Sequence, residues 1–174
     1  MSGATGSAPA GRDDAVAVLW QRHRPQLVRL AIGLTGDPAA AEEVVQDAFA
    51  ALLGRWNYLH DSSAAHAYLR RAVVNQVRTR WRAQKRRNRV AVLLAGGKTQ
   101  ANDPDLDTSL DVVAALRRLP WGKRACVLLR YYADLSEAET AALLGVSAGT
   151  VKSQTSKGLR QLAAPLDQTR SPLT

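Results

Sequence analysis

Residues 134–162, with the sequence DLSEAETAALLGVSAGTVKSQTSKGLRQL, predict two short helices joined by a tight turn. Ser136 is followed three residues later by Glu139, the pattern of a capping box, which places the start of a helix at Ser136. Gly145 fits the left-handed position that ends a helix, because glycine has no Cβ to clash there. Ser147 is a good N-cap for a second helix. The stretch therefore predicts a helix-turn-helix.

The second helix is expected to run to about residue 163 and to have one apolar and one polar side. Val151, Leu159 and Leu162 are predicted to point inward, and Val146 to close the corner of the turn. An exposed set of lysine, amide and hydroxyl side chains suits the major groove of DNA, where amides and hydroxyls bond base edges and lysines bind phosphate or guanine. An ordinary helical hairpin with a solvated polar face is the alternative. The predicted outward set is Lys152, Ser153, Gln154, Ser156 and Lys157.

The composition indicates a polyanionic partner and a cytoplasmic setting. The 174 residues carry a formal net charge of +9 with a pI near 10.4, which favours binding to nucleic acid or an anionic membrane. Cys126, the single cysteine, excludes an intrachain disulfide and is expected to be a buried thiol. Residues 1–14 have no apolar core for a secretory signal, and no apolar run approaches the roughly 20 residues that span a bilayer. Membrane insertion is therefore not expected.

Charge is distributed unevenly along the chain. No carboxylate lies between Asp61 and Asp103. A cationic stretch this uncompensated favours phosphate binding over a merely solubilising surface, because surface helices usually mix both signs. Affinity should then fall steeply with salt. The basic residues of this stretch are Arg70, Arg71, Arg78, Arg80, Arg82, Lys85, Arg86, Arg87, Arg89 and Lys98.

Hydrophobic periodicity predicts an all-α chain of two small helical domains joined by a flexible linker. Pro25 should kink or break the first helix near Arg24, and Asp37 followed by Pro38 marks the start of the second. No strand signal or internal repeat is evident. Helices are expected at residues 13–34, 37–53, 65–87, 109–119 and 123–133, before the helix-turn-helix, with linker composition at residues 89–108.

The run from Gly149 to Ser153, GTVKS, resembles the promoter-reading helix of bacterial RNA polymerase sigma factors of the extracytoplasmic-function (ECF) group. In that family a basic residue usually follows, whereas Gln154 stands here, which leaves the promoter sequence undetermined. The resemblance implies that this helix binds the −35 element as duplex. The implied −35 residues are Thr150, Lys152, Ser153, Gln154, Ser156 and Lys157.

The resemblance covers roughly residues 15–163. Residues 41–53, AEEVVQDAFAALL, are similar to region 2.2 of the family, the surface that grips a coiled coil of the largest polymerase subunit. On the residues alone a solvated acidic helix surface is the favoured interpretation. The resemblance instead implies a polymerase-binding face of Glu42, Glu43, Gln46 and Asp47.

Residues 67–82, AYLRRAVVNQVRTRWR, resemble regions 2.3 and 2.4, which melt and hold the −10 element. Thr79 stands where the family often has aspartate. Trp56, Tyr58, Tyr68 and Trp81 could stack on unpaired bases, although core packing is the favoured role for the two tryptophans. The implied −10 residues are Asn57, His60, Asp61, Ser62, Ser63, Arg70, Arg71, Asn75, Arg78 and Arg82.

The resemblance also implies a domain map: region 2 at residues 13–88, a linker at 89–108 and region 4 at 109–164, between tails at 1–12 and 165–174. Core RNA polymerase, through its coiled coil and flap, and promoter DNA are the implied partners, with an anti-sigma factor as a possible third. Linker residues Asp103, Asp105 and Asp107 either mimic nucleic acid in the polymerase cleft or serve only as a soluble connection.

Nothing in the sequence indicates catalysis. His23, His60 and His66, the only histidines, have no metal-ligand spacing, and Gly96-Gly97-Lys98 lacks the phosphate-loop pattern. No enzyme activity, metal, cofactor or small-molecule substrate is expected. The function predicted is that of an alternative sigma factor. A free-standing helix-turn-helix regulator that dimerises through its N-terminal helices is the main alternative, and a scaffold that binds protein or RNA through the basic helix is another.

Overall fold

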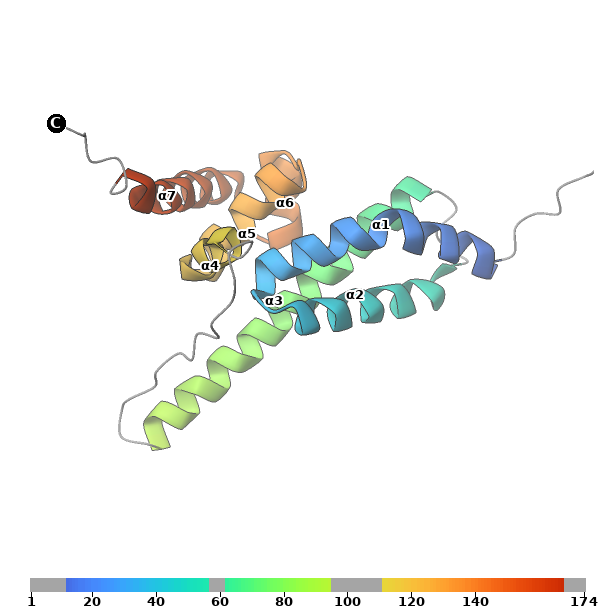
Figure 1. The fold of residues 1–174 in the computed structure, drawn as a ribbon, viewed down its shortest axis with the longest axis horizontal. Helices are drawn as coiled ribbons and strands as arrows, with labels where there is room; N and C mark the ends of the chain where they lie inside the picture. The colour runs from blue at the N-terminus through green and yellow to red at the C-terminus, as the bar shows by residue number, and fades with distance from the viewer. Residues whose placement is uncertain (1–11, 57–61, 95–110, 168–174) are drawn as a thin grey trace, which may run out of the picture.

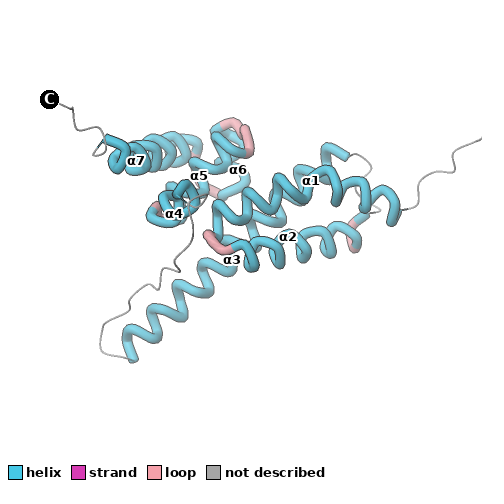
Figure 2. The backbone as a smooth tube through the Cα atoms, viewed as in Figure 1, coloured by secondary structure: helices cyan, strands magenta, loops and turns pink. Residues whose placement is uncertain are grey.

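The computed structural model describes residues 12–56, 62–94 and 111–167, and in these ranges all regular structure is helical (Figures 1 and 2). The prediction of an all-α chain is thereby confirmed for the described residues. The elements are α1 Arg12–Thr35, α2 Pro38–Leu53, α3 Ser62–Leu94, α4 Asp111–Arg118, α5 Trp121–Val127, a π-helical turn Leu128–Tyr132, α6 Glu137–Leu144 and α7 Ala148–Asp167.

Helix α1 runs through Pro25 without the predicted break. Pro25 lacks the N–H that would bond one turn back, and its ring is exposed to solvent. Buried leucines on both sides of it, among them Leu19 and Leu27, anchor the two halves of the helix against α2 and α3. Tertiary packing thus offsets the local cost of proline.

Helix α2 begins where the sequence predicts. The Asp37 carboxylate accepts hydrogen bonds from the backbone N–H groups of Ala39 and Ala40, at 2.8 and 3.3 Å, and Pro38 occupies the first helical position. The apolar side of α2 is fully buried against α1 and α3, and its polar side faces solvent. The buried residues are Ala41, Val44, Val45, Ala48, Phe49 and Leu52.

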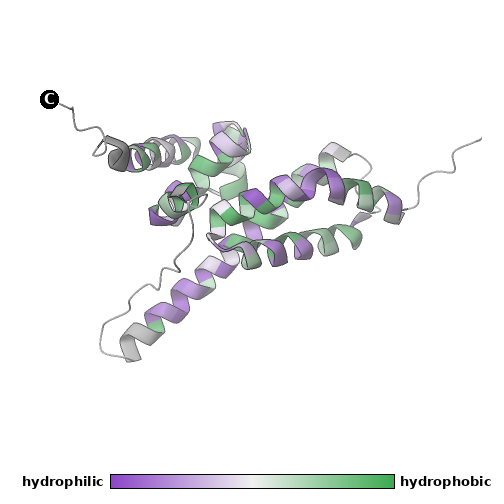
Figure 3. Ribbon diagram, in the orientation of Figure 1, coloured by the Kyte–Doolittle hydropathy of each residue, from purple (hydrophilic) through white to green (hydrophobic). Residues whose placement is uncertain are grey.

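Helix α3 is longer than the 65–87 predicted, because it continues to Leu94, six residues into the segment expected to be linker. Glycine first appears at Gly96, so nothing in residues 88–94 stops the helix. Its first half packs in the core through Leu69, Val73 and Val77. Its second half projects from the body as a hydrophilic rod (Figures 1 and 3).

In the C-terminal part, α5 and α7 pack closely because α7 has a glycine at the crossing. A Cβ on Gly158 would lie 2.8 Å from Cγ2 of Val127. Val151, Thr155, Gly158 and Leu162 therefore form the inner stripe of α7, of which Val151 is fully buried. The prediction that Leu159 points inward is wrong: it lies one position beyond the stripe and is 36% exposed.

Candidate nucleic-acid interface

The helix-turn-helix has the local geometry that its sequence predicts. The Ser136 hydroxyl accepts the Glu139 N–H at 3.1 Å, and the Glu139 carboxylate accepts the Ser136 N–H at 2.8 Å, which confirms the capping box. Hydrogen bonding of the Glu139 carboxylate to the side chain and then to the backbone of Ser136 lowers the pKa of Glu139 below its usual value. Gly145 has φ +66°, the left-handed conformation expected at the end of α6.

Helix α7 is fixed at its start by Ser147, whose hydroxyl accepts the Thr150 N–H at 3.1 Å and lies 2.9 Å from the Thr150 hydroxyl. Val146, expected to close the corner, is instead 41% exposed, because the left-handed Gly145 turns the chain outward at this point. The start of α7 is thus held by hydrogen bonds.

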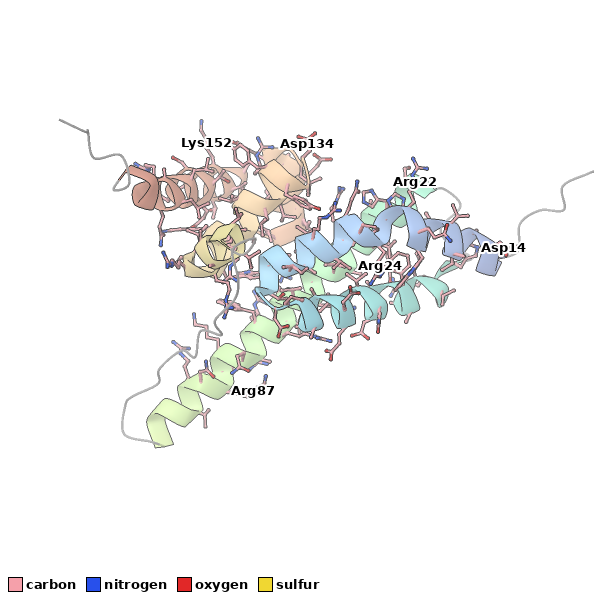
Figure 4. The ribbon with its side chains drawn as sticks, viewed as in Figure 1. Asp14, Arg22, Arg24, Arg87, Asp134 and Lys152 are labelled. Atoms are coloured by element: carbon pink, nitrogen blue, oxygen red, sulfur yellow. The ribbon has the colours of Figure 1, made fainter. Side chains whose placement is uncertain are left out.

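Most of the −35 residues predicted on α7 share one exposed side. Thr150, Lys152, Ser153, Ser156 and Lys157 are all exposed, and we call them the −35 surface. Lys152 points away from the rest of the molecule (Figure 4). Gln154 differs: it is half-buried, and its side-chain amide lies against Gly122 of α5, where a Cβ would be 3.8 Å from its Cδ. The structure therefore separates Gln154 from the other five.

The −10 residues predicted in the loop, Asn57, His60 and Asp61, lie outside the described residues, as does the side chain of Ser62. Ser63 is exposed at the start of α3. Of the remainder, four recur at three- and four-residue steps and therefore share one side of α3. This α3 stripe consists of Arg71, Asn75, Arg78 and Arg82.

Arg70 lies apart from the α3 stripe. It lines a pocket of about 380 Å³ between α1 and the turn after the π-helical segment, together with Arg29, His66, Tyr132 and Asp134. The residues that line the pocket come from both the N-terminal and the C-terminal half of the chain. Arg70 thus belongs to the contact between the two halves of the molecule.

One member of the α3 stripe already has a partner within the chain. Arg78 donates a hydrogen bond from Nη1 to the backbone carbonyl of Leu144, at 2.8 Å. Leu144 is the last residue of α6. Sequence reasoning did not foresee this contact, because 66 positions separate the two residues.

The acidic face of α2, defined as Glu42, Glu43, Gln46 and Asp47, lies on the solvent side of the helix. Arg80 of α3 bridges two of its carboxylates, with Nη1 2.8 Å from Glu43 and Nη2 3.1 Å from Asp47. Nη2 of Arg24 in α1 donates to both carboxylate oxygens of Glu42 in α2, at 2.7 and 2.8 Å. No pattern in the sequence indicates these pairings, which join separate helices.

The tryptophans considered for base stacking take part in packing. Trp81 stacks on Trp121 of α5, with ring centroids 5.8 Å apart, and Lys85 lies 5.2 Å from the Trp81 ring centroid. Trp56 is half-buried against the core. Tyr58 lies outside the described residues. Base stacking by Trp81 would require it to leave Trp121.

Two histidines stack between α1 and α3. The rings of His23 and His66 lie 4.3 Å apart at an interplanar angle of 15°. Burial, followed by the charge of Arg22, lowers the pKa of His23; burial, followed by the charges of His23 and Arg70, lowers the pKa of His66. Burial raises the pKa of the Cys126 thiol to about 11.

Across the described parts of the chain, no cluster of histidine, cysteine or carboxylate side chains is arranged to hold a metal ion. None of the helices in those parts is both long and apolar enough to cross a membrane.

Comparison with known proteins identifies the family. Residues 19–87 match the model of sigma-70 region 2, and residues 109–162 match that of sigma-70 region 4. The RNA polymerase sigma-E factor of Streptomyces antibioticus is 36% identical over 142 residues, covering 81% of this chain and 78% of that protein. The ECF RNA polymerase sigma factor SigL of Mycobacterium tuberculosis is 32% identical over 169 residues, covering 92% of this chain and 94% of that protein.

Solved structures agree with this assignment. The sigma factor RpoE of Bartonella quintana, in complex with the anti-sigma factor NepR, superposes with a TM-score of 0.68 at 24% identity over 88% of this chain and 97% of that one. CnrH, in complex with the cytosolic domain of CnrY, gives 0.62 at 26% identity over 92% of each chain. The chain therefore belongs to the sigma-70 family, as an alternative sigma factor of the ECF group that binds core RNA polymerase and serves promoter recognition in transcription initiation.

Proposed function

We propose that the residues of this sigma factor divide promoter recognition among three surfaces: the acidic face of α2 docks on core polymerase, the α3 stripe holds −10 DNA, and the −35 surface of α7 binds −35 duplex. The domain map is 13–88 for region 2 and 109–164 for region 4, with residues 89–108 between them. The chain acts in the cytoplasm as a non-catalytic initiation factor, without metal or cofactor.

The −35 assignment rests on two properties that α7 combines: polar side chains exposed to solvent, and a helix start held in place by hydrogen bonds. Two lysines and two serines face solvent together on a helix whose start is capped by Ser147. A recognition helix needs both properties, because its side chains must reach base edges from a backbone in fixed register. Gln154 packs against α5, so we assign it to holding α7 in place.

The α3 stripe is suited to phosphate because its arginines have no carboxylate neighbours along the helix. Between Asp61 and Asp103 the sequence has no acidic residue to neutralise them. Each phosphate neutralised should contribute about −0.7 to the log–log salt slope on single-stranded DNA. Asn57, His60 and Asp61, with Ser62 and Ser63 at the start of α3, remain the proposed base-contacting residues.

An anti-sigma factor is a proposed regulator. Both structural relatives were solved with a partner bound, NepR in one case and the cytosolic domain of CnrY in the other. Because the present chain superposes on them through both halves, the same kind of partner fits it.

Two weak sites joined in one chain should bind promoter DNA well only when polymerase holds both in place. The test mixes the purified chain with bacterial core polymerase in size exclusion and then measures promoter binding with and without polymerase. We expect co-elution, and tight promoter binding by the complex alone. A chain that binds promoter duplex equally well without polymerase, or elutes apart from it, would instead be a free-standing regulator.

A further inference from the structure

The pocket that Arg70 lines lies outside the surfaces proposed for polymerase and DNA. It has a volume of about 380 Å³ and is formed where α1 and the first half of α3 meet the turn after the π-helical segment. Pockets that hold small ligands typically have volumes of roughly 300–1,000 Å³. The cavity is therefore large enough for a small organic molecule.

Two arginines line the pocket from different helices, Arg29 from α1 and Arg70 from α3. Neither guanidinium makes a hydrogen bond or an ion pair with any other described residue. Asp134 lines the same pocket, yet its carboxylate pairs with neither of them. A guanidinium presents a fixed fork of N–H donors that matches phosphate or carboxylate oxygens. Two such unpaired forks around one cavity favour an anion with several oxygens.

His66 adds an uncharged hydrogen-bonding group to the pocket. Burial, followed by the charges of His23, Arg70 and Arg22, lowers the pKa of His66, so its imidazole is neutral at neutral pH. A neutral imidazole donates through one ring nitrogen and accepts through the other. The positive charge that the pocket offers at neutral pH therefore comes from its two arginines, which match the two negative charges of a phosphomonoester.

The turn that carries Asp134 has a rare backbone conformation. Asp134 has φ +51°, in the left-handed region that residues with a Cβ seldom adopt, and it lies two residues beyond the π-helical turn Leu128–Tyr132. The Tyr132 hydroxyl lies 3.3 Å from the carbonyl oxygen of Gln26, which joins this turn to α1. Both kinds of backbone irregularity occur frequently at functional sites. Here they bring an exposed carboxylate, an acceptor of hydrogen bonds, to the pocket.

The remaining surface of the pocket is largely apolar. Leu27 and Leu30 of α1, each 2% exposed, line it together with the half-buried Ala133. A bare phosphate ion would use neither this apolar surface nor the carboxylate of Asp134. A phosphate that carries a nucleoside would use both, because the base has an apolar face and the sugar hydroxyls and base amino groups are hydrogen-bond donors.

We propose that the pocket binds a nucleoside 5′-monophosphate. The phosphate lies between Arg29 and Arg70, a hydroxyl or amino group of the ligand donates to Asp134, and the base lies against the two leucines. Arg29 and Asp134 are exposed, so the pocket is open to a ligand from solvent. This inference goes beyond the proposed function, because none of these residues belongs to the acidic face, the α3 stripe or the −35 surface.

The test titrates the full-length free chain with each of the four ribonucleoside 5′-monophosphates by isothermal titration calorimetry. Inorganic phosphate and the matching nucleosides are the comparison ligands. We expect at least one nucleotide to bind with a stoichiometry of one and a Kd about tenfold or more below those of phosphate and the nucleoside, since each of these lacks contacts that the nucleotide makes. A Kd for phosphate or for the nucleoside equal to that of the nucleotide, or no binding of any nucleotide at millimolar concentration, would overturn the inference.

Arg29→Gln removes one cation of the pocket without breaking a contact within the described residues. It should raise the Kd of the nucleotide about tenfold, because hydrogen bonds to charged groups are the strong ones. Arg22→Gln is the matched control: Arg22 is exposed on the same side of α1, two turns earlier, does not line the pocket and lies well apart from Asp134 in Figure 4. Equal losses in the two variants would mean that total charge attracts the nucleotide, and would overturn the inference.

Ala133→Leu keeps every charge and reduces the volume of the pocket. In a chain whose Tm shows that it is folded, the larger side chain should raise the Kd of the nucleotide about fivefold or more, because it occupies space that the base needs. Nucleotide binding that neither Ala133→Leu nor Arg29→Gln weakens would lie elsewhere on the chain and would contradict the inference. The titrations contain no polymerase or DNA, so they decide the pocket separately from the proposed function.

Discussion

The −35 surface on α7 and the charged surfaces of the N-terminal half differ in how their side chains are engaged before any partner arrives. Lys152, Ser153, Ser156 and Lys157 are exposed, and the structure gives them no intramolecular hydrogen bond or ion pair among the described residues. In the N-terminal half, by contrast, Glu43 and Asp47 are paired with Arg80, and Arg78 holds the Leu144 carbonyl. If the proposed roles are right, the −35 surface can bind DNA without breaking any of these contacts, whereas the N-terminal surfaces have to exchange partners.

The largest expected effect tests the N-terminal side of this comparison. Reversing two charges of the acidic face, Glu43→Lys with Asp47→Lys, should weaken association with core polymerase on the order of 100-fold, because complementary charge becomes repulsion at the interface. Surface plasmon resonance against immobilised core polymerase measures it.

Asp14→Lys is the control for this experiment, since Asp14 is an exposed carboxylate at the far end of α1 (Figure 4). The control should keep wild-type affinity. Equal losses in both variants would mean that total charge, and not the acidic face, governs docking.

The next largest expected effect concerns the −35 surface of α7. Lys152→Ala should weaken −35 duplex binding by the polymerase complex roughly tenfold, since a good base or phosphate contact contributes about 1–3 kcal/mol. Polymerase association should be unchanged. Electrophoretic mobility shift with −35 duplex gives the comparison, and Arg160→Ala, an exposed cation farther along α7, is the matched control. Loss of polymerase binding in Lys152→Ala would show that the domain map is wrong.

We attribute the fixed geometry of the helix-turn-helix to local capping. Measuring the thermal stability of a capping variant tests this claim. Ser136→Ala removes the hydroxyl that accepts the Glu139 N–H and should cost about 1 kcal/mol of unfolding free energy. Thermal denaturation should show a Tm lower by about 2–4 °C. Ser153→Ala, on the exposed side of α7, is the control and should leave Tm near wild type.

Arg80→Ala is expected to have a smaller effect, on both the stability of the chain and its docking on polymerase. Exposed ion pairs contribute about 0–1 kcal/mol, so the free energy of unfolding should change by less than about 1 kcal/mol. Docking on polymerase should tighten about two- to fivefold, because Glu43 and Asp47 no longer need to leave a partner. Weaker docking would mean that Arg80 itself contacts polymerase.

The stacked histidines give the smallest effect, a pH dependence confined to the N-terminal half. Because the pKa values of His23 and His66 are lowered on folding, their stabilising contribution is complete above about pH 6.5 and is lost as pH falls through the lowered values. The charges of Arg22 and Arg70 act on His66, and Arg29 and Asp134 line the same pocket as His66. Tm of the wild type should therefore fall more between about pH 7.5 and about pH 5.5 than Tm of His66→Gln. Parallel curves would contradict this account.

The sequence predicts well the features that depend on interactions between residues close together in the chain. The Asp37 and Ser136 caps and the left-handed Gly145 each depend on neighbours within a few residues, and all three occur as predicted. The inward Leu159 was wrong and Gln154 is half-buried for a tertiary reason, since Gly158 lets α7 sit closely on α5 and thereby sets which residues face it.

The partners of the charged residues could not be predicted, because they lie far away in sequence. Arg80 is 37 positions from Glu43, and Arg124 is 90 positions from Leu34. Helical periodicity places each arginine on a side of its helix but does not identify the neighbouring helix. The contact of Arg78 with the Leu144 carbonyl therefore emerges only from the structure.

The most direct test of the whole account maps transcript 5′ ends made by core polymerase and the purified chain on a pool of genomic fragments. The account predicts new start sites that share −35 and −10 elements and that are lost selectively with Lys152→Ala. A transcript pattern identical to that of core polymerase without the chain would contradict it.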